Sequence, residues 1–441
     1  MRRKGFIIVC LLLLVIVIGT LLFLKSDRGH KMSENAAVRV VETNEGYELL
    51  KNGKPFYIKG ASGDGYIQEL VQAGGNTIRL YDTINTTKQL DVAYQKGVSV
   101  ILDIPLPDYG RGKWTYSDDQ GVKNLTTYVQ KYVNKHKNHP ALLYWNLGNE
   151  LIYPLTIFPN RFTETVNDLI DLIHEEDPNH PIATTVAGTS RAQTLGIHLH
   201  SPKFDLIGYN VFGSVKILDK TQNQLSYFLK LKPYYISEWG DQGPWEANNE
   251  YWFSIQEKKG SEKARGYFRT YQDNILNNHS MLGSTAFYWG QKFEGTPDWF
   301  NIFDEKGYKS PIYYALKSSW EKTDLIYPLE IVYLKFKNLS SKDNRIFRPE
   351  EPLEMETLAQ SNYSDSLTYE WNLYKESSSI YEGWKLLSSE FNLKGKGEEI
   401  NFNTPEEEGA YRMVLRVYDN QQNYSTANIS FYVLNPNDKK E

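Results

Sequence analysis

The sequence predicts an α/β fold: a (β/α)8 TIM barrel, preceded by an N-terminal transmembrane anchor and followed by a C-terminal β-sandwich. Three observations lead to this prediction. An uncharged run lies near the N-terminus, short apolar runs then alternate with helix-like segments up to about residue 320, and the remainder alternates apolar with polar residues. The predicted divisions are an anchor at 1–25, a linker at 26–37, a barrel domain at 38–325 and a sandwich domain at 326–441.

The anchor is predicted from the run Phe6–Leu24, which contains nineteen uncharged residues and follows Arg2, Arg3 and Lys4. That length can span a bilayer, and the basic cluster is expected on the cytoplasmic side. A cleaved signal peptide would have a shorter apolar core and a small-residue cleavage site. The segment therefore predicts a single-pass protein of the cell membrane whose remaining residues are extracellular, with secretion after signal cleavage as the alternative.

The barrel is predicted from eight apolar or β-branched runs. A hairpin around Asn52-Gly53, a pair typical of a type I′ turn, leads into the first of them. The expected strands are 56–62, 76–82, 98–105, 141–147, 181–186, 205–210, 234–237 and 283–289. Helices are expected at 67–72, 89–96, 123–135, 162–175 and 263–277, and the apolar residues of 162–175 have the spacing of one helix face.

Strands that alternate with helices predict parallel βαβ units, and eight of them in about 270 residues fit a (β/α)8 barrel. A doubly wound open sheet is the alternative, but no Gly-x-Gly-x-x-Gly motif follows the first strand. After residue 320 the segments 367–374, 409–418 and 425–433 alternate in the manner of an antiparallel, Ig-like β-sandwich.

Composition excludes several classes of function. A net charge of −5 and a pI near 6.0 give no reason to expect nucleic-acid binding. The single cysteine, Cys10, excludes a disulfide framework and a cysteine-based metal site. His198 and His200 are interpreted as structural residues, and no metal or organic cofactor is implied.

Polar and aromatic residues occur near the C-terminal ends of the expected strands, where barrels carry their functional side chains. They are Arg79 on the second strand, Asn149 and Glu150 after the fourth, Tyr209 on the sixth, Glu238 after the seventh and Trp289 on the eighth. The fourth and seventh strands lie across an eight-membered ring, so Glu150 and Glu238 are expected to face each other. Paired carboxylates are what cleavage of a glycosidic bond requires.

Two segments that contain these glutamates, Trp145-Asn-Leu-Gly-Asn-Glu150 and Ile236-Ser-Glu-Trp-Gly240, resemble motifs of the retaining (β/α)8-barrel glycoside hydrolases of clan A, including family 2. The resemblance covers about residues 45–320. The run 76–82 followed by 98–103 is similar to β-glucan-processing members. The resemblance implies that Glu150 is the acid/base and that Glu238 is the nucleophile.

The same resemblance implies roles for the neighbouring residues. Asn149 would bond the sugar 2-hydroxyl, and Arg79 would keep Glu238 ionised. Trp289 would form the floor of the −1 subsite, where an aromatic face packs against sugar C–H groups. Tyr209 is a candidate donor to Glu238, with its neighbour Asn210 as a competitor, and Trp299 is a candidate for outer subsites. Purely structural roles remain open: an ion pair for Arg79, core packing for Trp289 and surface decoration for Trp299.

The sequence thus predicts a retaining β-glycoside hydrolase that acts on a β-glucan-like polysaccharide or oligosaccharide through a covalent glycosyl-enzyme intermediate. A transglycosylase that uses the same intermediate is one alternative. A membrane-tethered carbohydrate-binding protein on an inactive barrel is the other, and the retention of both glutamates, Asn149 and Arg79 argues against it.

Overall fold

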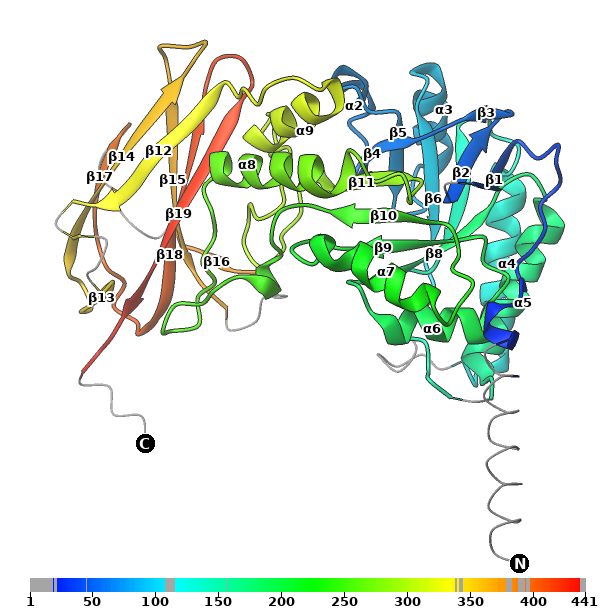
Figure 1. The fold of residues 1–441 in the computed structure, drawn as a ribbon. Coiled ribbons are helices and arrows are strands. Elements are labelled where there is room, and N and C mark those ends of the chain that lie inside the picture. Colours follow the sequence, from blue (N-terminus) through cyan, green and yellow to red (C-terminus); the bar gives the residue numbers. More distant parts are fainter. Residues whose placement is uncertain are drawn as a thin grey trace, which may run out of the picture. The chain divides into compact units, whose positions relative to one another are not determined.

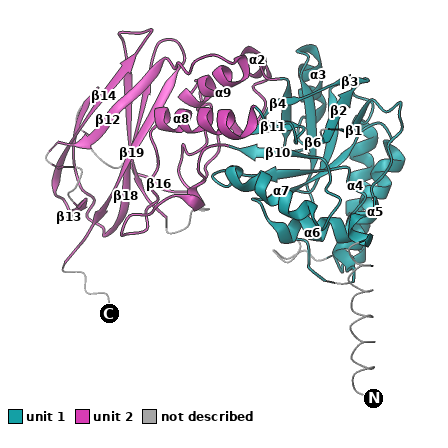
Figure 2. Cartoon of the chain, in the orientation of Figure 1, with its two compact units in different colours: residues 1–62, 76–239, 277–286 teal, residues 63–75, 240–276, 287–441 magenta. Residues whose placement is uncertain are grey.

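The structure is a computed structural model that describes residues 19, 22–44, 46–107, 116–156, 158–337, 339–340, 344–377, 383–387, 393 and 397–436. The chain divides into two compact units (Figure 2). Unit 1 comprises residues 1–62, 76–239 and 277–286, and unit 2 comprises residues 63–75, 240–276 and 287–441. The segment 240–276 belongs to unit 2 because its helix α8 (Gly260–Thr270) packs against strands of the C-terminal sandwich.

The transmembrane anchor predicted for residues 1–25 is corrected. No helix in the described part of the chain is long and apolar enough to cross a membrane. Residues 1–18, 20 and 21 of the predicted segment lie outside the described residues.

The barrel prediction is confirmed: eight strands form a closed, parallel barrel in the order β10-β11-β4-β5-β6-β7-β8-β9 (Figure 1). Its strands are β4 (Ile58–Gly63), β5 (Thr77–Leu80), β6 (Ser99–Ile104), β7 (Leu142–Leu147), β8 (Ile182–Ala187), β9 (Leu206–Asn210), β10 (Tyr234–Trp239) and β11 (Gly283–Trp289). Closure of this sheet excludes the doubly wound alternative, which would leave two open edges.

The helices between the strands agree in part with the expected ones. The structure contains α2 (Ile67–Gln72), α3 (Thr86–Gln95), α4 (Asp119–His136), α5 (Arg161–Glu176), α6 (Arg191–His200), α7 (Leu218–Ser226), α8 (Gly260–Thr270) and α9 (Pro311–Glu321). Short 3-10 turns lie at η1 (Val215–Ile217) and η2 (Pro244–Glu246), and a π-helical turn, η3 (Tyr271–Ile275), extends α8.

Helix α5 illustrates how local sequence determines an element. The Asn160 side chain accepts a hydrogen bond from the Thr163 backbone N–H, and the Thr163 hydroxyl accepts one from Asn160 N–H, so two orphan donors are satisfied at the N-terminus. The apolar residues predicted to share one face are all buried. Helix α6 was not predicted, because its C-terminal half alternates apolar and polar residues in Gly-Ile-His-Leu-His. Within it His198 and His200 each bond a backbone carbonyl, of Thr194 and Thr156, as the structural interpretation expects.

A hairpin covers the N-terminal end of the barrel. Together with a preceding strand it forms a three-stranded antiparallel sheet of β1 (Val38–Thr43), β2 (Gly46–Lys51) and β3 (Lys54–Pro55), in which β2 and β3 are the hairpin expected around Asn52-Gly53. Val38 and Leu49 of this small sheet join one apolar cluster with residues at the beginnings of barrel strands, including Ile58 and Leu206. The cluster closes this end, which leaves the C-terminal ends of the strands for polar side chains.

The C-terminal part of unit 2 contains two sheets that share one apolar core. One sheet has the order β12-β14-β17 and the other has the order β13-β19-β18-β15-β16. Their strands are β12 (Leu329–Phe336), β13 (Ile346–Phe347), β14 (Pro352–Ser361), β15 (Thr368–Lys375), β16 (Lys385–Leu386), β17 (Glu399–Asn403), β18 (Gly409–Tyr418) and β19 (Tyr424–Val433). The predicted β-sandwich is therefore present, and it differs from an all-antiparallel one because β13 pairs with β19 in parallel.

Candidate active site

Strand β7 ends in a turn that directs two polar side chains to the C-terminal end of the barrel. Gly148 has a φ of +76°, and Glu150 has a φ of +53°, a left-handed conformation that is uncommon for residues other than glycine. A side chain at position 148 would also collide with Leu151. The Glu150 backbone N–H donates to Thr185 Oγ1 of β8 at 3.0 Å and so secures the turn. Such strained conformations cluster at functional sites.

A fully buried guanidinium organises the site. Arg79 on β5 donates two hydrogen bonds to the carboxylate of Asp103 on β6, from Nε at 2.9 Å and from Nη2 at 2.7 Å. Its Nη1 donates to Glu238 Oε1 at 3.2 Å, and its Nη2 donates to Asn149 Oδ1 at 2.8 Å. Burial alone would lower the pKa of Arg79, but the charge and the hydrogen bonds of Asp103 outweigh it and raise this pKa well above its usual value, so the side chain stays charged.

The Asn149 amide has a defined orientation. Its Oδ1 accepts hydrogen bonds from Arg79, from Thr185 Oγ1 at 2.7 Å and from Asn210 Nδ2 at 3.2 Å. Because a guanidinium can only donate, the atom that it contacts must be the oxygen. The NH2 group therefore points the other way, and no described residue accepts a hydrogen bond from it. Asn149 is exposed, so this amide is available as a donor to a bound molecule.

Glu238 at the end of β10 is buried and accepts two hydrogen bonds on one oxygen. Besides Arg79, the hydroxyl of Tyr81 donates to Oε1 at 2.9 Å. Burial and the negative charge of Glu238 raise the pKa of Tyr81 well above its usual value, so the phenol keeps its proton and acts as a donor. The Oε1 atom of Glu238 is thus held by one cationic donor, Arg79, and one neutral donor, Tyr81.

Glu150 has a different environment. Its Oε1 accepts a hydrogen bond from Asn210 Nδ2 at 2.8 Å, and the Asn210 Oδ1 accepts one in turn from Ser237 Oγ at 2.6 Å. Asn210 also contacts Asn149, which contacts Arg79, which contacts Glu238. One hydrogen-bonded network therefore connects the two glutamates, as expected for residues that face each other across the barrel.

The structure directs Tyr209 away from this network. Its hydroxyl lies 3.1 Å from Thr194 Oγ1 of α6, and its ring is buried against Tyr234. Successive side chains of a strand point to opposite faces, so when Asn210 faces into the barrel, Tyr209 faces the surrounding helices. The predicted contact of Tyr209 with Glu238 is therefore replaced by that of Tyr81, and Asn210, the competing candidate, belongs to the site.

Trp289 and Trp299 lie in unit 2, where both are buried. The Trp289 Nε1 donates to the Tyr66 carbonyl oxygen at 3.1 Å, and its ring packs against Phe303. The Trp299 Nε1 donates to the Gln242 carbonyl oxygen at 2.9 Å. The Trp289 ring has no exposed surface, which matches the core-packing alternative. The subsite roles of both tryptophans stay predictions.

Sequence reasoning missed Asp103, Tyr81 and the central position of Asn210. A signal for Asp103 was present, because an acidic residue within the apolar run 98–105 needs a buried partner. Tyr81 lies one residue after β5 and two residues after Arg79, so it shares the face of Arg79. The shared face places Tyr81 in the site only when it is known that this face of the strand points into the barrel.

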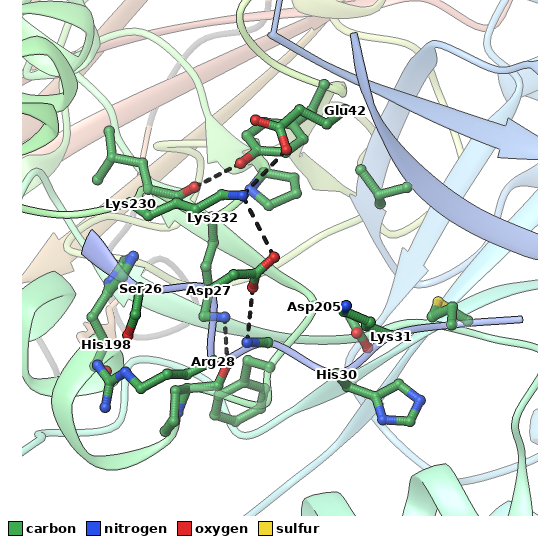
Figure 3. Close-up of a pocket in the computed structure, with 18 of the residues that line it drawn as sticks. Ser26, Asp27, Arg28, His30, Lys31, Glu42, His198, Asp205, Lys230 and Lys232 are labelled. Atoms are coloured by element: carbon green, nitrogen blue, oxygen red, sulfur yellow. Dashed lines mark hydrogen bonds and ion pairs between the residues drawn. The ribbon is translucent and has the colours of Figure 1, made fainter. Parts of the chain in front are cut away.

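Unit 1 also contains a cavity of about 350 Å³ at the opposite end of the barrel strands (Figure 3). It lies between the segment 24–32 and residues that precede β9 and β10, such as Asp205 and Lys232. Lys230 forms ion pairs with Asp27 and Glu42 at its edge, at 3.5 and 3.2 Å. This cavity is separate from the glutamate network, because it borders the N-terminal ends of the strands.

The family model described as "Glycosyl hydrolases family 2, TIM barrel domain" matches residues 70–305. Among curated proteins, a putative β-glucuronidase of Formosa agariphila is 28% identical over 115 residues, which are 25% of this chain and 13% of that protein. The β-glucuronidase of Chlorocebus aethiops is 24% identical over 233 residues, which are 46% of this chain and 34% of that protein. The chain thus spans about a third or less of the length of these relatives.

Solved structures resemble the chain in fold. A β-glucuronidase of Bacteroides uniformis matches with a TM-score of 0.51 and 15% identity, over 90% of this chain and 48% of that one. A β-D-glucuronidase of Dictyoglomus thermophilum matches with a TM-score of 0.51 and 15% identity, over 66% of this chain and 54% of that one. At this identity the likeness concerns the fold alone.

Proposed function

The chain belongs to glycosyl hydrolase family 2 through its TIM-barrel domain, and from this premise we propose that it is a retaining β-glycoside hydrolase. One observation carries the proposal: two glutamates share a hydrogen-bonded network but have unlike partners. Glu238 accepts hydrogen bonds from Arg79 and Tyr81, whereas Glu150 accepts one from the neutral Asn210 amide. Unlike environments for two carboxyl groups are how one site supports an acid and a nucleophile together.

The reaction proceeds in two displacements. In the first, Glu238 attacks the anomeric carbon, the bond from that carbon to the leaving oxygen breaks, and Glu150 gives its proton to that oxygen. In the second, Glu150 takes a proton from water, the water oxygen attacks the anomeric carbon, and the Glu238 carboxylate leaves. The Asn149 NH2 group donates to the sugar 2-hydroxyl, a contact that strengthens as positive charge develops on the ring.

The hydrogen-bond donors to Glu238, the Arg79 guanidinium and the Tyr81 hydroxyl, support its role as nucleophile. Hydrogen bonds to the ionised carboxylate favour that form, and charge-assisted bonds are stronger than neutral ones. Asp103 balances the remaining charge of Arg79 through two hydrogen bonds and holds the guanidinium in place. Arg79 and Asp103 therefore act as positioning residues.

The substrate that we propose is a β-linked, β-glucan-like glycan. A β-glucuronide is the second candidate, because the curated relatives are described as β-glucuronidases. A transglycosylase would use the same residues and differ in the acceptor of the second step, a sugar hydroxyl in place of water. A non-catalytic carbohydrate-binding protein would show no turnover on any substrate.

The test is an assay of the whole chain on aryl β-glucosides, β-glucuronides and β-galactosides, and on soluble β-glucans. We expect turnover that falls at least about 10³-fold in Glu238→Gln, because the covalent step is lost. Glu164→Gln, an exposed glutamate on α5, is the matched control and should retain full activity.

The stereochemistry of the first product distinguishes the mechanism. NMR of the fresh reaction should show the β-anomer for a retaining enzyme, whereas an α-anomer would show inversion and remove the nucleophile role of Glu238. Glu150→Ala should slow aryl substrates with poor leaving groups most, and added azide should restore turnover by attacking the intermediate. Turnover unchanged in either glutamate variant would exclude the proposed site.

A further inference from the structure

Unit 2 contains a cavity that does not belong to the glutamate network. It has a volume of about 600 Å³ and lies between the loop that follows β10 and the C-terminal sandwich. Trp245, Trp252 and Phe253 line it from the loop, and Glu376 and Ala410 line it from the sandwich. Cavities of about 300–1,000 Å³ are typical of small-molecule sites.

The aromatic side chains of the loop are presented to solvent. Phe253 is 84% exposed and Trp245 is 50% exposed. Phe253 also has a φ of +67°, a conformation that is rare for a bulky residue and costs free energy. In the isolated chain, Phe253 therefore carries two free-energy costs, the exposure of its ring to water and its positive φ. A bound molecule that covers the ring would offset the first of these costs.

The loop is held against the sandwich by ionic and backbone contacts. Asn249 and Ile255 form an antiparallel bridge that makes the loop a small hairpin. Arg345 forms an ion pair with Glu250, and Arg412 Nη2 donates to the Ile255 carbonyl oxygen at 2.6 Å. These contacts hold the loop against strand β18 and against the residue that precedes β13. The exposed rings are therefore preorganised for binding.

The polar groups of the cavity suit a neutral polyol. The Asn249 side chain is exposed, and no hydrogen bond to it is made by the described residues. Ser254 is 3% exposed, and its Oγ has no hydrogen-bond partner in the described chain, so rotation about χ1 could bring it to a ligand hydroxyl. Among the described lining residues the only charge is that of Glu376, which Arg412 neutralises in an ion pair.

We propose that this cavity is a second binding site, separate from the glutamate network, for a neutral segment of the substrate glycan. The proposal rests on the proposed function for the identity of the glycan. Aromatic faces pack against sugar C–H groups, the Asn249 amide and the Ser254 hydroxyl bond sugar hydroxyls, and no free charge is left to favour an anionic polymer.

The experiment measures binding and turnover separately. Binding of soluble β-1,3-glucan, cello-oligosaccharides and hyaluronan is measured by calorimetry and affinity electrophoresis in the Glu238→Gln background, in which the polymer is not consumed. Phe253→Ala and Trp245→Ala are compared with Tyr363→Ala, which removes a ring that is 63% exposed elsewhere in unit 2. With Glu238 intact, kcat/KM on the best aryl glycoside is measured for the same three substitutions.

We expect Phe253→Ala and Trp245→Ala each to weaken binding of the neutral glycans by roughly 2- to 10-fold, with kcat/KM on the aryl glycoside unchanged. Tyr363→Ala should leave both quantities unchanged. Asn249→Ala, which keeps the aromatic rings, should weaken binding as well, and thermal melting should show that all variants are folded. Hyaluronan, which is anionic, should bind more weakly than the neutral glycans.

Equal affinities of the wild-type background, Phe253→Ala and Trp245→Ala would overturn the proposal, and so would tighter binding of hyaluronan that depends on these residues. Absence of aryl-glycoside turnover together with glycan binding that depends on Phe253 would overturn the proposed function and support this site. Turnover of an aryl glycoside together with no glycan binding in the Glu238→Gln background would support the proposed function and overturn the second binding site.

Discussion

Replacement of Asp103 by alanine tests the idea that a buried ion pair holds the site together. The carboxylate of Asp103 makes two charge-assisted hydrogen bonds to Arg79, and the side chains are 5% and 0% exposed. A hydrogen bond to a charged group is worth about 1.5–3 kcal/mol, and removal of one partner of a buried pair costs about 3–5 kcal/mol. Both routes lead to a loss of about 4 kcal/mol in the free energy of unfolding.

The assay is urea denaturation followed by circular dichroism, with kcat/KM measured on the same samples. Asp171→Ala is the control, because the ion pair of Asp171 with Lys203 is about half exposed and should contribute only about 0–1 kcal/mol. We expect Asp103→Ala to lose activity as well, since Arg79 would no longer be held toward Glu238 and Asn149.

A double-mutant cycle isolates the pair. Asp103→Leu combined with Arg79→Met should be more stable than the sum of the single losses by at least about 2 kcal/mol, because each single variant leaves one charge of the Asp103–Arg79 pair buried without the other, and the double variant removes both. Additive losses, or a loss in Asp103→Ala no greater than that in Asp171→Ala, would refute the reasoning. In that case Arg79 would be stabilised chiefly by its other partners.

Three further predictions follow from single contacts. Tyr81→Phe removes the hydroxyl that donates to Glu238, and kcat/KM should fall by about 10- to 100-fold while the melting temperature changes little. Gly148→Ala should lower the free energy of unfolding by at least about 1 kcal/mol, because φ is +76° and the new Cβ would collide with Leu151; an unchanged denaturation midpoint would contradict this. Burial lowers the pKa of His198 from 6.5 to about 4, so the unfolded chain binds a proton that the folded one does not. Stability should therefore fall by about 3 kcal/mol as the pH drops from 6.5 to 4, and His198→Gln should flatten the pH profile of the unfolding free energy over that range.

The pattern of the chain was sufficient to predict the barrel, because each strand is a local apolar run and each gap has room for a helix. All eight strands occur within a few residues of their predicted limits. Helices α6, α7 and α9 are not among the expected ones, and in α6 the alternating C-terminal half hides the helical period. The transmembrane anchor was predicted from length and hydropathy alone, and no described helix meets the requirement for spanning a membrane.

The sequence by itself determined that Glu150, Glu238, Asn149 and Arg79 belong together, since each lies in a motif or at a strand end of one barrel. Only the tertiary structure decided which of two adjacent residues faces inward. Side chains alternate along a strand, so a change of register by one residue would point Tyr209 into the barrel and Asn210 toward the helices. The local sequence does not indicate which of these two registers is adopted. The contact of Asp103 with Arg79 was likewise decided by the tertiary structure. Pairing of β5 with β6 brings together two charged side chains that are 24 residues apart in the sequence, and their burial is tolerable only because each compensates the charge of the other.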